Sequence, residues 1–389
     1  MKPPAVLAVL VALTGCTGSS AGPEDGAGPS VAAPSVATTT SSAGPAPTSS
    51  SPSTSAPTSA APTTRPPTRR VTVADGLDVP WGLAFLPDGS ALLTTRDEAA
   101  LFHVREGAAP VRLGTVPGVD PGGEGGLLGV AVSPEFESDG SIFLYLTARD
   151  DNRVVRMTFA DGRARNLQAV LTGIPKAGNH NGGRIAFGPD GFLYIATGDA
   201  GDGSSAQDRS SLAGKILRVT PEGRPAPGNP FDGSPVWSYG HRNVQGLAWD
   251  SSGRLFASEF GQSTWDELNL IRPGGNYGWP EVEGRAGQSR FVDPLRQWDT
   301  PESSPSGIAV TADGTVYMAA LRGESLWRIP FRDGQAGEPE RLLRAEYGRL
   351  RDVVVGPDGR LWVLTNNTAR GTPRRGDDRL LVIPEATLR

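Results

Sequence analysis

The chain has 389 residues, and its 37 lysines and arginines nearly balance its 42 aspartates and glutamates, for a net charge of −5. No excess of positive charge points to nucleic-acid binding. The single cysteine, Cys16, excludes an internal disulfide and a thiolate metal centre. The 51 glycines and 35 prolines favour many turns, and helical periodicity is scarce, so the composition indicates a mainly β protein.

The N-terminus carries an export signal. Lys2 precedes a short apolar run at residues 5–13, which is too short to span a bilayer. The run ends in Leu13-Thr14-Gly15-Cys16, a tetrad that resembles the lipobox of bacterial lipoproteins. We therefore expect residues 1–15 to be a lipoprotein signal peptide and Cys16 to be lipidated. The protein would then be exported and anchored to the outer face of the cell membrane through the lipid alone. An ordinary secretory signal with an accidental cysteine is the alternative.

Residues 16–70 consist almost entirely of Ser, Thr, Ala, Pro and Gly. Such a segment has no aromatic residue and too little apolar surface to offset the entropy lost on ordering. The composition predicts a disordered linker between the anchor and the folded domain.

The rest of the chain, residues 71–389, repeats one pattern six times. An apolar strand, a short Asp-Gly or Ser-Gly turn and a second apolar strand follow one another, with the period-two alternation of a half-buried strand. The copies span residues 82–95, 129–148, 184–199, 246–260, 307–321 and 352–366.

A third strand-like run follows most copies, and the turns recur at intervals typical of propeller blades. These features predict an all-β, six-bladed β-propeller, with five or seven blades as alternatives. Residues 69–77 form a spare strand before the first copy, which could complete the last blade and close the ring.

Two polar stretches precede the third and fourth copies. In the first, His180 lies between asparagines and before two glycines, where a ligand can approach its ring, and histidine is the natural general base near neutral pH. Asp199 could orient that imidazole, although, taken alone, a turn-forming aspartate is the better explanation. In the second, Arg242, Asn243 and Gln245 form a set of donors suited to carbonyl or carboxylate oxygens, or simply satisfy a loop.

Two further stretches suggest ion binding. A turn at Gly261 and Gln262, followed by Asp266 and Glu267, could offer main-chain carbonyls and carboxylates to calcium, although the spacing is not that of an EF-hand. Near the last copy, the alternation at residues 349–352 places Arg349 and Arg351 on one face. Two such guanidinium groups suit a multiply anionic ligand, and solvated surface arginines are the alternative.

Taken together, these stretches resemble the soluble PQQ-dependent glucose/sorbosone dehydrogenase family over residues 71–384. Six motifs in the same order carry the resemblance: VPWGLAFLPDG at Val79, GEGGLLGVAVSP at Gly123, HNGGRIAFGPDGFLYIATGD at His180, GHRNVQGLAWD at Gly240, DELNLIRPGGNYGWP at Asp266 and RLRDVVVGPDG at Arg349. The resemblance implies oxidation of the anomeric hydroxyl of aldoses, or of related sugar alcohols, to lactones by hydride transfer to pyrroloquinoline quinone (PQQ) with calcium.

The resemblance also implies roles for single residues. His180 matches the general base, Asp199 its acidic partner, and Arg242 the arginine beside the reacting quinone oxygens. Glu124 lies where the family often has a polar residue on the substrate side. The remaining matches are cofactor contacts from Asn243, Gln245, Arg349 and Arg351, and main-chain calcium ligands from Gly261 and Gln262.

The sequence departs from the family at one cofactor contact. Where well-known members have a lysine, this chain offers Arg322, in keeping with a chain whose cations are nearly all arginine. The loops that would build the sugar pocket also look short, so glucose need not be the substrate. The electron acceptor is not indicated by any residue.

Two other classes of function remain open at this stage. A calcium-dependent lactonase-type hydrolase would need a carboxylate-rich metal cluster from several blades. A non-catalytic binding propeller on the cell surface would need no cofactor.

Overall fold

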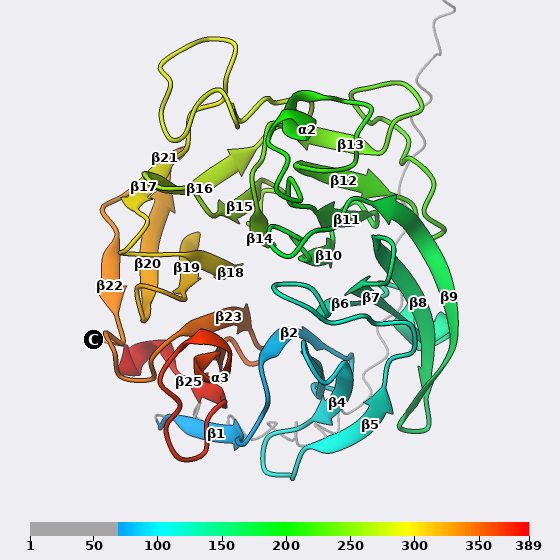
Figure 1. Cartoon of the computed structure of the whole chain (residues 1–389). Coiled ribbons are helices and arrows are strands. Elements are labelled where there is room, and N and C mark those ends of the chain that lie inside the picture. Colours follow the sequence, from blue (N-terminus) through cyan, green and yellow to red (C-terminus); the bar gives the residue numbers. More distant parts are fainter. Residues whose placement is uncertain (1–68, 389) are drawn as a thin grey trace, which may run out of the picture. The chain divides into compact units, whose positions relative to one another are not determined.

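The computed structural model describes residues 69–388, which form a ring of six antiparallel sheets around a central axis (Figure 1). The predicted six-bladed β-propeller is confirmed. Cys16, the signal peptide and nearly all of the predicted linker lie outside the described residues. No helix within residues 69–388 has the length and apolar character needed to cross a membrane.

Each blade is a four-stranded meander. The innermost strands are β2 (Pro80–Phe85), β6 (Leu127–Val132), β10 (Ile185–Phe187), β14 (Val244–Trp249), β18 (Pro305–Val310) and β23 (Leu350–Val355). The second strands are β3 (Ala91–Thr95), β7 (Ser141–Thr147), β11 (Leu193–Ala196), β15 (Leu255–Glu259), β19 (Thr315–Ala320) and β24 (Leu361–Thr365). The third strands are β4 (Ala100–Val104), β8 (Asn152–Ala160), β12 (Lys215–Val219), β16 (Trp265–Ile271), β20 (Ser325–Arg332) and β25 (Leu380–Ile383). The outer strands are β5 (Val111–Thr115), β9 (Arg163–Ile174), β13 (Val236–Tyr239), β17 (Arg296–Asp299), β22 (Glu340–Leu342) and β1 (Val71–Ala74).

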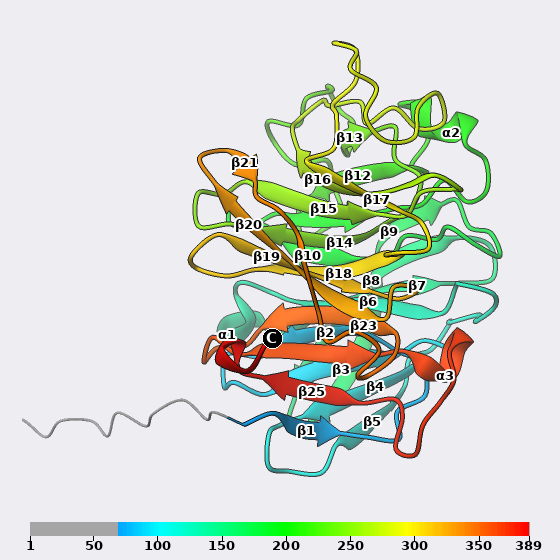
Figure 2. The same cartoon turned by 90° about the vertical axis from the view of Figure 1, so that its left-hand side faces the viewer.

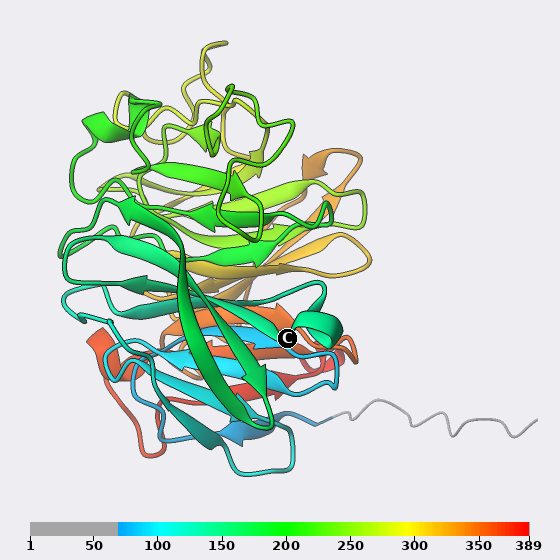
Figure 3. The same ribbon diagram turned by 90° about the vertical axis from the view of Figure 1, so that its right-hand side faces the viewer.

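The remaining elements are short. A small strand, β21 (Gln335–Ala336), extends the end of β20. The helical turns are α1 (Phe136–Asp139), α2 (Ser204–Gln207), α3 (Asn367–Arg370) and a 3₁₀ turn, η1 (Glu385–Thr387). Seen from the side, α2 and α3 lie at one face of the ring and α1 at the opposite face (Figure 2). The longest strand, β9, runs along the outside of the ring (Figure 3).

The ring closes as the sequence predicts. The first strand of the described chain, β1, pairs antiparallel with β25, so that the last blade contains both ends of the domain (Figure 1). The Leu77 amide donates to the Asp378 carbonyl at 3.0 Å and extends this seam. Closure leaves no gap between the first and last blades at which the ring could open.

The turns between first and second strands depend on aspartate and glycine together. In the third blade Gly191 has φ +77°, which favours glycine, and Asp190 accepts a hydrogen bond from the Phe192 amide at 3.2 Å. Because such a turn joins each innermost strand to the second strand, all six hairpin tips point to one face of the ring. The starts of the innermost strands and the ends of the second strands therefore share the opposite face.

The core lies between the blades. The second strands β3, β7, β11, β15, β19 and β24 are buried along their whole lengths. The expectation of half-buried strands is wrong for them, because neighbouring blades cover both faces of each sheet. Trp81, Leu128, Tyr145 and Ile185, for example, belong to one cluster that joins three blades. Burial of this kind is the main source of stability in a propeller.

Candidate active site

A polar cavity of about 460 Å³ lies at the face where the innermost strands begin. Nine of the residues singled out in the sequence line it: Glu124, His180, Arg242, Asn243, Gln245, Gly261, Arg322, Arg349 and Arg351. They come from five blades. All innermost strands run in the same direction, so the loops before them and after the second strands meet at one face of the ring. Asp199 and Gln262 do not line it: Asp199 lies behind His180, and Gln262 follows Gly261 with its side chain exposed. Asp266 and Glu267 are buried and lie outside the lining. The volume falls within the roughly 300–1,000 Å³ typical of small-molecule sites.

His180 and Asp199 form a closely spaced pair. His180 Nδ1 lies 2.7 Å from Asp199 Oδ1, with side-chain exposures of 15% and 2%. Asn179 Nδ2 lies 3.2 Å from Nε2, and an amide can only donate there. The network therefore places the imidazole proton on Nδ1 and a lone pair on Nε2. His180 also adopts φ +54°, a left-handed conformation that is uncommon outside glycine and recurs at functional sites.

Several contacts hold this pair in position. Asp199 accepts hydrogen bonds from Trp279 Nε1 at 2.8 Å and from the Gly201 amide at 2.8 Å. Burial by itself would raise the pKa of Asp199, but the hydrogen bonds from His180, Gly201 and Trp279 outweigh burial, and the pKa lies below its usual value. Gly198 packs so closely that a Cβ atom would lie 1.8 Å from the His180 carbonyl oxygen. Asp199 is thus ionised and fixed beneath the imidazole.

The Glu124 carboxylate lies beside His180 at the mouth of the cavity. Its Oε2 atom accepts a hydrogen bond from the His180 amide at 3.0 Å. Its Oε1 atom lies 3.4 Å from Arg370 Nη1, in α3 of the last blade. Glu124 therefore links the histidine loop to the opposite rim.

Arg242 lies against the calcium-type turn predicted from the sequence. Its Nη1 atom donates to the carbonyl oxygens of Gly261 at 2.7 Å and Phe260 at 3.2 Å, and its guanidinium lies 5.4 Å from the centre of the Trp279 ring. Burial lowers the pKa of Arg242. The side chain is a half-buried cation with backbone oxygens and an aromatic ring as neighbours.

Arg351 lies deepest in the site. It donates to Gln245 Oε1 at 2.6 Å and to Asn366 Oδ1 at 3.1 Å. Burial, followed by repulsion from Arg96, Arg349 and Arg184, lowers its pKa to about 9. The predicted placement of Arg349 and Arg351 on one side holds, because both line the cavity.

Buried guanidinium nitrogens in this region are left without a hydrogen-bond partner. Among the residues that the structure describes, these are Arg184 Nη2, Arg242 Nε, Arg349 Nε and Arg351 Nε. Buried polar atoms are nearly always paired in folded proteins, and an unpaired donor costs about 1–3 kcal/mol. Unsatisfied donors on neighbouring cations indicate a place for an anion.

The turn at Gly261 is braced by carboxylates. Glu283 Oε1 accepts hydrogen bonds from four successive amides, those of residues 262–265, and Asp266 accepts from the amides of Gly261 and Ser304. Burial raises the pKa of Asp266 to about 7. The Asp266 carboxylate therefore fixes the turn, and the Gly261 carbonyl is the acceptor of the Arg242 hydrogen bond. Within residues 69–388 no group of three His, Cys, Asp or Glu side chains is placed to hold a metal.

Other residues of the site were not found in the sequence. Trp81, Arg96, Asn366 and Arg370 line the cavity, and Trp279 braces Asp199. Trp81 and Trp279 fall inside quoted motifs but carry no local sign of their contacts. Arg370 lies in a connection without any motif.

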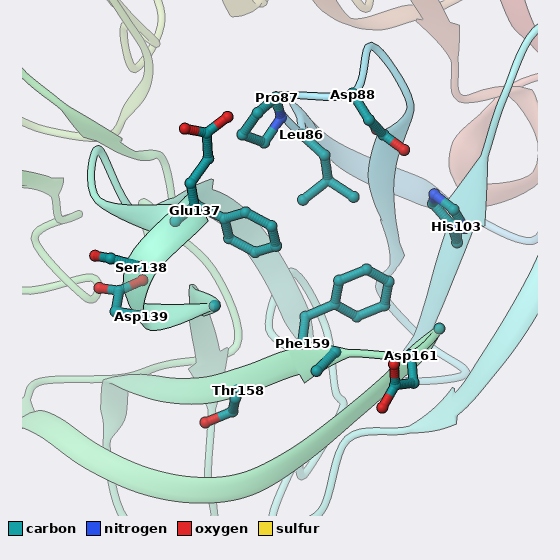
Figure 4. Close-up of a pocket in the computed structure, with 14 residues that line it drawn as sticks. Leu86, Pro87, Asp88, His103, Glu137, Ser138, Asp139, Thr158, Phe159 and Asp161 are labelled. Atoms are coloured by element: carbon teal, nitrogen blue, oxygen red, sulfur yellow. The ribbon is translucent and has the colours of Figure 1, made fainter.

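A larger and more open hollow of about 910 Å³ lies at the opposite face, between the first two blades. Asp88, Glu137, Asp139 and Asp161 surround it, with the rings of His103 and Phe159 (Figure 4). Asp88 accepts hydrogen bonds from Ser90, and Asp139 accepts one from Ser133 at 2.8 Å. Asp88 and Asp139 thus accept hydrogen bonds within the hairpin turns. None of the site residues predicted from the sequence lines this hollow.

The fold and the cavity define a six-bladed propeller with an arginine-rich site and a histidine–aspartate pair at one mouth of the ring. Residues 77–372 match the family model described as Glucose / Sorbosone dehydrogenase. The chain belongs to this family, as the motifs predict.

The relatives include characterised enzymes. The aldose sugar dehydrogenase YliI of Escherichia coli is 33% identical over 334 residues, which cover 76% of this chain and 89% of the relative. A PQQ-bound aldose sugar dehydrogenase from Streptomyces coelicolor is 55% identical with a TM-score of 0.78, covering 82% of this chain and 99% of that one. The quinoprotein glucose dehydrogenase B of Acinetobacter calcoaceticus is 30% identical over 57% of this chain and 54% of the relative.

Proposed function

We propose that this protein oxidises the anomeric hydroxyl of aldoses to lactones by hydride transfer to PQQ. The observation that carries the proposal is the set of buried, unsatisfied guanidinium groups beside the His180–Asp199 pair. The predicted enzyme class, a quinoprotein sugar dehydrogenase, and the predicted PQQ cofactor are confirmed by the family and by the PQQ-bound relative at 55% identity. The lactone product and the roles of single residues belong to the proposal.

The residues of the cavity fit PQQ, which carries three carboxylates. Arg351 is buried and Arg349 half-buried, each has a buried Nε without a hydrogen-bond partner, and Arg322 is an exposed cation at the rim. Guanidinium groups match carboxylates through paired hydrogen bonds and keep their charge when buried. Asn243 and Gln245 add amide groups to the same wall, so Arg349, Arg351 and Arg322 would hold the carboxylates.

Calcium would be bound by the main-chain carbonyls of Gly261 and Gln262, together with oxygens of the cofactor. Oxygen ligands of this kind suit a hard cation. The carboxylates of Asp266 and Glu283 bind the amides of the turn and hold it in place, and calcium would compete with Arg242 for the Gly261 carbonyl. A rigid turn lowers the conformational cost of binding the ion.

When bound, PQQ supplies the oxidant that accepts two electrons and a proton from C1 of the sugar. His180 Nε2 carries the lone pair that would take the proton of the anomeric hydroxyl once the sugar replaces the Asn179 amide, and ionised Asp199 would stabilise the resulting imidazolium. Arg242 would stabilise negative charge that develops on an oxygen in the cavity. Glu124 lies close enough to the histidine loop to accept a hydrogen bond from a sugar hydroxyl.

The arrangement is less suited to the alternatives. A lactonase-type hydrolase would need a carboxylate-rich metal cluster, and the carboxylates of Asp266 and Glu283 are instead occupied by backbone amides. A purely binding propeller would have no use for a histidine that a buried aspartate holds with its Nε2 lone pair toward the cavity.

The test is a titration of the full-length apo protein with PQQ and calcium, followed by addition of aldoses. We expect calcium-dependent PQQ binding, bleaching of the oxidised quinone band by sugar, and a lactone among the products. His180→Ala should bind PQQ with similar affinity and bleach it at least 100-fold more slowly, because general-base catalysis contributes about 10²–10⁴-fold. Full activity in this variant would remove His180 from the mechanism.

We also propose that the protein is exported and anchored to the membrane's outer face through a lipidated Cys16. The proposal is supported by the apolar run at residues 5–13 and by the lipobox-like tetrad. Fractionation of cells and mass measurement of the mature N-terminus test it, with Cys16→Ser as the control. A Cys16→Ser protein that remains in the membrane fraction would overturn the lipid anchor.

A further inference from the structure

The cavity holds more positive charge than the cofactor can neutralise. Its lining contains six arginines and one carboxylate, that of Glu124. Arg96 is already paired with Asp97 at 2.6 Å. After this pair, Glu124 and the three carboxylates of PQQ are counted, one guanidinium group would remain in excess, and calcium would add positive charge. A cleft lined by one sign of charge concentrates ligands of the opposite sign.

Arg370 is the cation best placed to act on a substrate. It lies in α3 at the rim, with its side chain 63% exposed, and its Nη1 atom is 3.4 Å from Glu124 Oε1. The other Glu124 oxygen accepts the His180 amide proton. One carboxylate thus connects Arg370 to the loop of the catalytic base.

The position of Arg370 is fixed by the fold. The buried Asp378 carboxylate accepts a hydrogen bond from the Thr368 amide at 3.1 Å, and the Thr368 hydroxyl in turn accepts one from the Val79 amide at 3.0 Å. These bonds tie α3 to the start of the first blade. The Arg370 side chain is exposed, but the backbone that carries it is anchored, as for a ligand-contacting side chain on a rigid element.

We propose that Arg370 makes this site selective for aldoses that carry an anionic group remote from the anomeric carbon, with hexuronates as the first candidates. The inference rests on the proposed function. A sugar whose C1 hydroxyl reaches His180 Nε2 would direct its far end toward the rim. Glu124 would accept hydrogen bonds from ring hydroxyls, and Arg370 would pair with the sugar carboxylate, for which a guanidinium is the matching partner.

The chemistry at C1 is unchanged by the anionic group. The C1–H and O–H bonds break, the lactone C=O bond forms, two electrons and one proton pass as hydride to the bound PQQ, and the second proton passes to His180. The sugar carboxylate is neither oxidised nor reduced. Its contribution is to binding, so the effect of Arg370 should fall mainly on KM.

The test uses the full-length protein loaded with PQQ and calcium, with glucose, glucuronate and glucose 6-phosphate as substrates. We expect the wild type to have a higher kcat/KM for glucuronate than for glucose, and the preference to weaken as salt rises from about 20 to 200 mM. Arg370→Gln should lower the glucuronate-to-glucose ratio of kcat/KM about two- to fivefold, as for exposed ion pairs, because the Arg370 side chain is largely exposed. Arg370→Lys should lie between the two.

A matched control and a second measurement distinguish a substrate contact of Arg370 from a general charge effect and from a contact with PQQ. Arg332→Gln removes an exposed arginine in β20, outside the cavity, and should leave the ratio at the wild-type value. The PQQ dissociation constant of Arg370→Gln, measured by titration of the apo protein, should stay within about twofold of wild type. A large loss of PQQ affinity would show that Arg370 serves the cofactor and would overturn the inference.

Each of the other possible results either supports or overturns the inference about Arg370. A wild type that prefers glucose, or a ratio that Arg370→Gln does not change, overturns the inference while glucose turnover leaves the proposed function standing. Preference for glucose 6-phosphate with the same dependence on Arg370 supports the anionic class and identifies phosphate as the group. Failure to oxidise any aldose overturns the proposed function and this inference with it.

Discussion

Replacing Asp199 with asparagine tests how the site activates its base. The 2.7 Å contact between Asp199 Oδ1 and His180 Nδ1 is buried on the aspartate side, where only 2% of the side chain is exposed. Loss of a charge-assisted hydrogen bond of this kind costs about 1.5–3 kcal/mol, or roughly 10- to 150-fold in kcat. The loss grows if the asparagine amide donates to Nδ1, because the imidazole proton then moves to Nε2 and the lone pair needed for catalysis disappears.

The assay is steady-state oxidation of an aldose by the PQQ-loaded protein with an artificial electron acceptor. Because Asp199 does not line the cavity, KM and PQQ affinity should change little while kcat falls. Asp190→Asn is the control, since Asp190 lies in the same blade at the opposite end and pairs with Arg218 at 2.9 Å. A kcat for Asp199→Asn above half the wild-type value would refute the reasoning.

The pH dependence of stability gives an independent check on the same pair. Since the pKa of Asp199 lies below its ordinary 3.8 in the folded protein, its contribution to stability is complete above about pH 4. That contribution is lost as the pH falls through the lowered pKa. The wild type should therefore lose stability relative to Asp199→Asn in this acidic range, as measured by urea unfolding.

Three further substitutions probe the surroundings of the site. Trp279→Phe removes the 2.8 Å bond to Asp199 and should lower kcat about 3- to 10-fold, with little change in PQQ affinity by titration. Arg351→Gln should weaken PQQ binding by at least about 10-fold, as measured by fluorescence titration, while a kcat at saturating PQQ near wild type would confirm a purely binding role. Lys215→Met leaves the carbonyls of Ser205, Ala206 and Ala213 without their donor and should destabilise the fold by roughly 1–3 kcal/mol in urea unfolding. Burial lowers the pKa of Lys215 to about 8, whereas the unfolded chain keeps the ordinary value of 10.5. The free energy of unfolding of the wild type should therefore rise as the pH increases from about 8 to 10.5, and this rise should be absent in Lys215→Met.

The fold could be predicted because its signal is local and repeated. Each blade contains its own hairpin turn, and an aspartate and a glycine at residues such as Asp190 and Gly191 satisfy the turn without help from other blades. Six such signals at blade-like spacing leave few other architectures. The burial of the second strands on both faces was missed, because period-two alternation describes one sheet and not the stacking of sheets around a ring.

The site was predictable where its residues enter or leave a blade next to a motif. His180 and Arg242 precede innermost strands, and Asp199 follows a second strand, so the hairpin geometry alone sends them to one face. Arg370 lies in a connection of the last blade and reaches Glu124 of the second blade across the mouth of the ring. Trp279 reaches Asp199 from the loop that follows β16. Contacts between blades of this kind depend on ring closure, and no spacing along the chain encodes them.

At buried positions in the site, arginine holds its charge better than lysine would. Desolvation lowers the pKa of any buried cation, and it brings Lys215 to about 8 but leaves Arg351, which is equally inaccessible and has three cationic neighbours, at about 9. Arginine begins from a higher pKa and therefore stays charged at neutral pH where lysine would be close to losing its proton. Repulsion among Arg96, Arg184, Arg349 and Arg351 is then a cost that the apo protein carries. An anionic ligand relieves this repulsion, so its binding should stabilise the fold as well as fill the site.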